Sequence, residues 1–163
     1  MDTSQFFAAV RPELVGDNGP SVRPGDDPLL YGSAVMTPCN PVEVRSFNTF
    51  EITYTVGRIG LDDTGGIRVC FRMISDFGKL QITDPSSPNF LSAKCSGSGK
   101  ISLRIAPEGQ RPWSLAITAQ LNGGYLNEGE QITLTFGDTS KGSPGFMMQT
   151  FAEGGFEFKV MTD

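Results

Sequence analysis

The chain has 163 residues, 38% of them hydrophobic and 19% charged, a size that suits one domain with a substantial core. Its net charge of −5 repels a phosphate backbone, so the composition argues against nucleic acid as a partner. The sequence contains no histidine, which removes Ser-His-Asp and Cys-His catalysis and every histidine-based zinc, iron or copper site.

Residues 1–30 are rich in proline and glycine, as in Gly19-Pro20 and Arg23-Pro24-Gly25. This composition predicts an extended N-terminal arm that lies along the domain. The first residues, Met1 to Phe7, include Asp2 and lack the basic start of a secretory signal. We therefore expect a cytoplasmic protein. Since no apolar run of about 18 residues occurs, we also expect no membrane partner.

From Tyr31 onward, short segments alternate between apolar and polar residues. Residues 50–56 place four large apolar side chains on one face and Glu and Thr on the other, which indicates a half-buried strand. Residues 67–73 alternate in the same way, with Arg68, Cys70 and Arg72 opposite the apolar set. Further strands are expected at residues 92–95, 101–105, 113–121, 132–136, 147–151 and 156–160.

Turn residues separate these segments throughout. The chain has 20 Gly and 11 Pro without a repeating period, and no long segment has the apolar spacing of a helix. Residues 31–163 are therefore predicted to form an all-β domain. The expected architecture is a two-sheet antiparallel β-sandwich, Ig-like or jelly-roll-like, of about seven to nine strands.

The three cysteines are Cys39, Cys70 and Cys95, an odd number with wide spacing. The sequence has no CxxC pair, so a structural zinc site is not expected. We expect reduced thiols that pack as small apolar groups, with one disulfide plus a free thiol as the alternative.

Two acidic stretches could be taken for cation sites. Asp62-Asp63 precedes Gly65-Gly66, but the glutamate that closes a calcium loop is missing, so a solvated turn is the stronger interpretation. Asp138 follows Phe136-Gly137, and we expect it to cap a turn by accepting backbone N–H bonds. The sequence thus predicts no metal, no cofactor and no catalytic residue in this chain.

Four residues are candidates for contact with a ligand or a partner: Arg68, Arg72, Asp76 and Trp113. Arg68 and Arg72 share one strand face, where they could bind a carboxylate or dock a second domain, or belong to a solvated face. Trp113, the only tryptophan, heads an alternating run and is expected in the core. If it is exposed instead, it becomes a sugar-stacking platform or an interface anchor.

Several short motifs follow one another in an order that resembles a known family. The chain from Tyr31 to Asp163 is similar to the N-terminal part of large bacterial proteins of the domain-of-unknown-function 3604 family. The motifs are Tyr31-Gly32-Ser33-Ala34, Thr53-Tyr54-Thr55-Val56-Gly57, Gly60 with Asp62-Asp63, Phe71-Arg72 with Ser75-Asp76-Phe77-Gly78, Asp84-Pro85 with Pro88-Asn89, Arg111-Pro112-Trp113, Phe136-Gly137-Asp138, Gly142-Ser143-Pro144-Gly145, Gln149-Thr150-Phe151-Ala152-Glu153 and Phe156-Glu157-Phe158.

In that family the segment precedes a larger portion similar to metal-dependent hydrolases of the polymerase-and-histidinol-phosphatase type. Such sites depend on histidines and carboxylates, and this chain has no histidine, so no catalytic residue carries over. The resemblance implies a non-catalytic accessory domain that packs against the C-terminal remainder of a longer protein.

Two other functions stay open. The domain could be a carbohydrate or small-molecule binding module that uses Trp113. It could also be a structural domain that self-associates into a homo-oligomer through its sheet edges.

Overall fold

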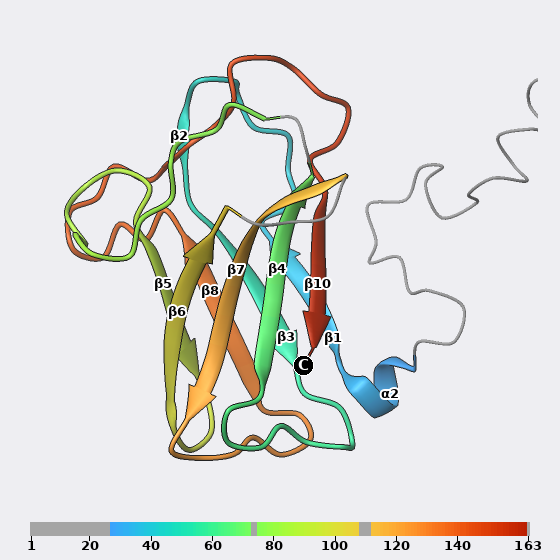
Figure 1. Cartoon of the computed structure of the whole chain (residues 1–163). Helices are drawn as coiled ribbons and strands as arrows, with labels where there is room; N and C mark the ends of the chain where they lie inside the picture. Colours follow the sequence, from blue (N-terminus) through green and yellow to red (C-terminus); the bar gives the residue numbers. More distant parts are fainter. Residues whose placement is uncertain (1–26, 73–74, 108–111, 163) are drawn as a thin grey trace, which may run out of the picture.

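The computed structural model describes residues 27–72, 75–107 and 112–162 and is a β-sandwich of two antiparallel sheets (Figure 1). The β3–β8 sheet has the strand order β1 (Ser33–Thr37), β3 (Phe50–Thr55), β8 (Gln131–Phe136) and β5 (Leu91–Cys95). The β4–β7 sheet has the order β10 (Phe158–Thr162), β4 (Gly66–Arg72), β7 (Trp113–Asn122) and β6 (Lys100–Ala106). The predicted all-β sandwich is confirmed.

A small ribbon closes one end of the sandwich. Strands β2 (Phe47–Asn48) and β9 (Phe146–Met147) pair there, and Gly137 fits against both of them. This end also holds the segment predicted as a strand at residues 147–151, of which only Met147 is in a strand.

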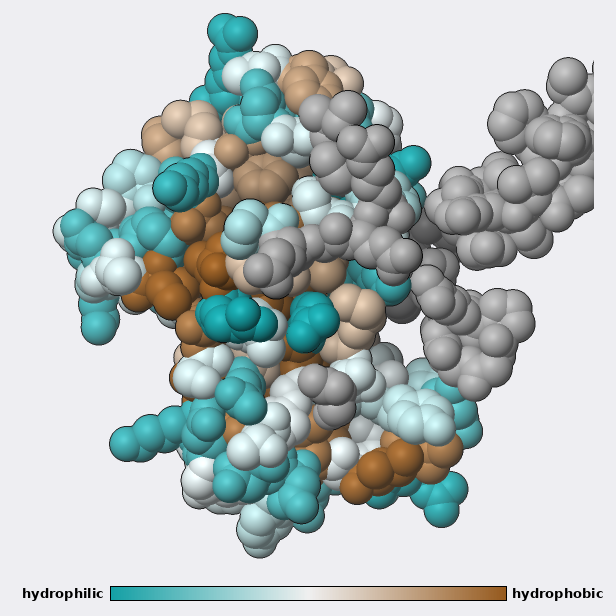
Figure 2. All heavy atoms as spheres, viewed as in Figure 1, coloured by the Kyte–Doolittle hydropathy of each residue, from teal (hydrophilic) through white to brown (hydrophobic). Residues whose placement is uncertain are grey.

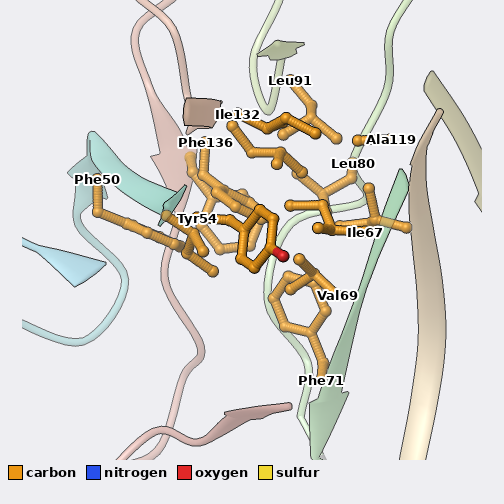
Figure 3. Packing of buried hydrophobic residues seen from close by; sticks show 14 of the residues in the cluster. Phe50, Tyr54, Ile67, Val69, Phe71, Leu80, Leu91, Ala119, Ile132 and Phe136 are labelled. Carbon is orange, nitrogen blue, oxygen red and sulfur yellow. The ribbon is translucent and has the colours of Figure 1, made fainter. Parts of the chain in front are cut away.

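The two sheets bury the faces that the alternation predicted. Phe50 and Tyr54 of β3 and Ile67, Val69 and Phe71 of β4 point into the space between the sheets (Figure 3). Ile52 of β3 is buried with them. Seven phenylalanines join into one aromatic cluster at the ribbon end, with ring centroids 4.6–6.4 Å apart. They are Phe50, Phe71, Phe77, Phe136, Phe146, Phe156 and Phe158.

A β-bulge in β7 changes which way its first residues face. Cys70 pairs with Ala116 and the next residue, Phe71, pairs with Ser114, so Leu115 is an extra residue with a positive φ of 41°. The extra residue reverses the alternation before it, and Trp113 pairs with the outward Arg72. Trp113 is half-buried rather than in the core, so that prediction is wrong.

One helical turn, α2 (Pro28–Tyr31), precedes β1 and docks on the loop after β3. Asp27 caps it by accepting a bond from the Leu29 backbone N–H, and Arg58 N–H donates to the Leu29 carbonyl at 2.9 Å. The end of the predicted arm, residues 28–30, is therefore helical and lies against the domain. Residues 1–26 of that arm lie outside the described part of the chain.

Candidate functional site: the outer face of the β4–β7 sheet

Three of the four candidate residues lie on the outer face of the β4–β7 sheet. Arg68 and Arg72 point outward from β4, because their neighbours Ile67, Val69 and Phe71 are buried between the sheets. Trp113 lies beside Arg72 on the adjacent strand β7. The fold thus brings together residues that are about 40 positions apart in the chain.

The strand register adds three more cations to this face. Arg104 of β6 pairs with Thr118, which in turn pairs with Arg68, so these residues form one row across the sheet. Lys100 follows on the same face of β6, and Lys159 of β10 pairs with Cys70. Sequence reasoning missed Lys100, Arg104 and Lys159. In residues 101–105, Arg104 alternates with the apolar Ile101, Leu103 and Ile105, but the sequence does not show that β6, β7, β4 and β10 are neighbours.

The face is strongly basic, although the protein is acidic. It carries five Lys or Arg side chains and one carboxylate, Glu157, at its margin. Since the whole chain has a net charge of −5 and this face has +4, the rest of the chain carries −9. Among the described residues, this basic face thus contrasts with a net charge of −6 on the others, from 11 Asp or Glu and 5 Lys or Arg.

Arg72 is already engaged with a carboxylate. Its guanidinium lies 2.6 Å from the Glu157 carboxylate, with the two side chains 51% and 38% exposed. This is the only ion pair within 4.0 Å that the described residues form. Within that part of the chain, Arg68, Lys100, Arg104 and Lys159 thus have no carboxylate partner.

Cys70 lies at the centre of this face and is nevertheless only 4% exposed. Its row neighbours Ala116 and Ala106 are also small. Burial raises the pKa of the Cys70 thiol, while the nearby charges of Arg68 and Lys159 act to lower it. Figure 2, which looks onto this face, shows strongly hydrophilic side chains standing apart with hydrophobic ones between them.

All three cysteines are free thiols, as expected. Cys70 is buried and Cys95 half-buried, but Cys39 is exposed, so the prediction that the cysteines pack as small apolar groups is wrong for Cys39. Cys39 is not part of this face.

Asp76 is not on this face. It lies at the ribbon end, where it accepts hydrogen bonds from the backbone N–H and the side-chain hydroxyl of Thr150. These hydrogen bonds, the hydroxyl's first, lower the pKa of Asp76. Next to it, Ser75 donates to Gln149, whose amide donates to Glu153, so Asp76 belongs to a network that fixes two loops.

The two acidic stretches behave as turn residues. Asp63 accepts from the backbone N–H groups of Thr64 and Gly123 at 3.1 and 2.8 Å, which ties two turns together. Asp138 accepts from the Ser140 backbone N–H at 2.9 Å, as predicted, and from the Ser92 hydroxyl. Among the described residues, no group of three or more Cys, Asp and Glu side chains is arranged to hold a metal ion.

The outer face of the β3–β8 sheet is different in character. Its described strands present mainly hydroxyl side chains there, with Lys94 as a single cation and Glu51 as a single carboxylate. The hydroxyl-bearing residues are Ser33, Thr37, Thr53, Thr55, Ser92, Thr133 and Thr135. Lys94 therefore offers a matched control for charge changes on the basic face.

Comparison with known proteins found no matching family model, curated protein or solved structure. In the residues described, no helix has the length and apolar character needed to cross a membrane.

Proposed function

We propose that this chain is a non-catalytic docking domain and that the outer face of the β4–β7 sheet is its contact surface. The observation that carries the proposal is the gathering of Arg68, Arg72, Arg104 and Trp113 on one sheet face of an otherwise acidic protein. Arginine and tryptophan are the residues most enriched where proteins bind one another, because they combine large contact area with directed hydrogen bonds.

A non-catalytic role agrees with the chemistry of the side chains. The sequence has no histidine, and the carboxyl groups of Asp76, Asp84 and Asp138 have lowered pKa values because they accept hydrogen bonds. A general acid needs the opposite, a pKa raised toward neutrality. These carboxylates instead hold loops in place.

The partner that we propose is the larger portion expected from the family resemblance, a metal-dependent hydrolase-like domain in the same protein. Docking through a sheet face would stabilise that portion or shape the entrance to its active site. A rigid sandwich suits this role, since its face is held by two layers of paired strands.

The proposal is tested in two steps, by sequencing the source gene and by measuring binding of the segment that it encodes. The reading frame past the codon for Asp163 is sequenced, and the product of the following segment is titrated onto this chain. We expect binding that Arg68→Glu weakens about tenfold or more and that Lys94→Glu leaves unchanged. A stop codon directly after Asp163, or binding that ignores Arg68→Glu, contradicts the proposal.

The non-catalytic part has its own test. The purified chain is incubated with phosphate esters and added manganese or zinc. We expect no turnover above the metal alone. Activity that survives repurification and follows the protein peak would show that the chain is an enzyme.

Carbohydrate binding is the second candidate, because Trp113 is half-buried and lies next to Arg72. An aromatic ring beside hydrogen-bonding side chains is a suitable platform for a sugar. Titration with oligosaccharides should then shift Trp113 fluorescence to saturation. Unchanged fluorescence at the highest sugar concentration removes this candidate.

A further inference from the structure

The chemistry of the partner follows from the basic face, and this inference rests on the proposed docking function. We infer that the surface is a carboxylate receptor. It binds an extended acidic segment of a partner protein that crosses strands β4, β7 and β6. Two carboxylates of this segment pair with Arg68 and Arg104.

The spacing of the two arginines suits such a segment. Arg68 and Arg104 are in one row with Thr118 between them, so they are two strand spacings apart, about 10 Å. In an extended chain, side chains on the same face repeat about every 7 Å. Two acidic residues separated by one residue can therefore reach both flexible guanidinium groups.

The next row across the sheet separates two sets of long side chains. Cys70, Ala116 and Ala106 have small side chains, and Lys159 lies at the β10 end of the row. Arg72 and Trp113 lie on the other side of this row. A partner segment laid across the sheet would thus have Arg68 and Arg104 along one side of this row, and Arg72 and Trp113 along the other.

One arginine of this face is already paired with a carboxylate. Glu157 holds the Arg72 guanidinium at 2.6 Å, so a carboxylate is the ligand that one of these arginines has within the chain itself. A planar guanidinium can pair with both oxygens of a carboxylate, which gives the contact direction as well as charge. On this face, Arg68, Lys100, Arg104 and Lys159 have no such partner among the described residues.

A nucleic acid is disfavoured by the rest of the molecule. The described residues outside this face include 11 Asp or Glu and 5 Lys or Arg, a net charge of −6, so they repel a long polyanion that extends past the face. A short acidic segment within a folded partner confines its charge to the face and avoids this repulsion.

The test uses a fluorescently labelled peptide of alternating Glu and Ser, and the same peptide with Gln in place of Glu as control. We expect the chain to bind the Glu peptide and not the Gln peptide. Arg68→Glu and Arg104→Glu should each raise Kd about tenfold, and Lys94→Glu on the opposite sheet should not. Both arginines are exposed, and the less severe Arg68→Gln and Arg104→Gln serve if a reversal impairs folding.

A gain of affinity gives an independent readout. Glu157→Gln removes the internal competitor of Arg72 with little change of shape, so the Glu peptide should bind several-fold more tightly. A purely structural role for the arginines would leave this affinity unchanged.

Three outcomes overturn the inference. In the first, the Glu peptide does not bind. In the second, Lys94→Glu weakens binding of the Glu peptide as much as Arg68→Glu does. In the third outcome, heparin binds far more tightly than the Glu peptide and Arg68→Glu weakens heparin binding to the same extent. The ligand would then be a sulfated polysaccharide. The docking proposal survives the first outcome if Arg68→Glu still weakens binding of the following segment, so the two failures can be told apart.

Discussion

Gly137 shows at the level of one residue how the ribbon is attached to the sandwich. It has a positive φ of 67°, and a Cβ atom there would overlap the backbone nitrogen of Phe146 and lie 2.6 Å from the Asn48 carbonyl oxygen. Only glycine lets the end of β8 approach both ribbon strands this closely.

Gly137→Ala should therefore lower the free energy of unfolding by about 2–4 kcal/mol, from backbone strain plus overlap. Gly142→Ala is the matched control, since Gly142 also has a positive φ but nothing within 4 Å of its added Cβ. It should lose only about 1 kcal/mol. Urea unfolding measures both, and equal losses would show that the close approach does not matter.

The charged form of Asp84 is favoured by several hydrogen bonds. Hydrogen bonds from the hydroxyls of Ser87 and Ser86 and from the Ser86 backbone lower its pKa from 3.8 to about 2. A lowered folded-state pKa stabilises the fold fully above pH 3.8, and this stabilisation is lost as the pH falls through about 2.

Asp84→Asn should accordingly flatten the fall of unfolding free energy between about pH 4 and pH 2. Titration of the Asp84 carboxyl by NMR should give a midpoint near 2. A midpoint near the ordinary value of 3.8 would mean that the serine hydrogen bonds do not hold in solution.

The candidate residues show what sequence could and could not predict. The outward direction of Arg68 and Arg72 followed from alternation with buried Ile67, Val69 and Phe71. Trp113 was assigned to the wrong face, because one extra residue at Leu115 reverses the pattern and no local signal marks that bulge.

At the scale of elements, the aromatic cluster joins strands from both sheets. Phe71 of β4 is fully buried, and its ring centroid lies 4.6 Å from that of Phe77, 4.9 Å from Phe158 and 5.8 Å from Phe136. Phe158 is also its partner in the β10–β4 pair, whereas Phe136 belongs to the facing sheet, so the cluster connects two sheets that share no strand pairing.

Phe71→Ala should lower the free energy of unfolding by about 3–5 kcal/mol, since it opens a cavity among these rings. Phe151→Ala, at a side chain that is 40% exposed, should cost less than about 1 kcal/mol. Thermal unfolding followed by circular dichroism compares them. A small effect of Phe71→Ala would mean that the cluster is loosely packed.

Most strands could be predicted, and the exceptions have physical reasons. Strand β1 was missed because its outward Val35 is apolar and 53% exposed, so residues 33–37 show no clear alternation. Strand β10 lies two residues later than predicted. A shift of two keeps the side-chain faces, and Phe158 and Val160 still point inward.

At the scale of the whole molecule, the separation of charge is the main finding. Three of the four strands in one sheet carry five outward cations, whereas the facing sheet presents mainly hydroxyl groups and the rest of the chain has a net negative charge. Composition alone indicated an acidic protein. The basic face was not predictable, because its residues come from four separate segments whose order in the sheet is set by the topology.

The most direct measurement follows the amide chemical shifts of the isotope-labelled chain during titration with the Glu-rich peptide. The account predicts shifts confined to β4, β6, β7 and β10, largest near Arg68 and Arg104 and abolished by about 0.5 M salt. Shifts that instead map to β1, β3, β5 and β8, or no shifts at all, would contradict the claim that the basic face is where a partner docks.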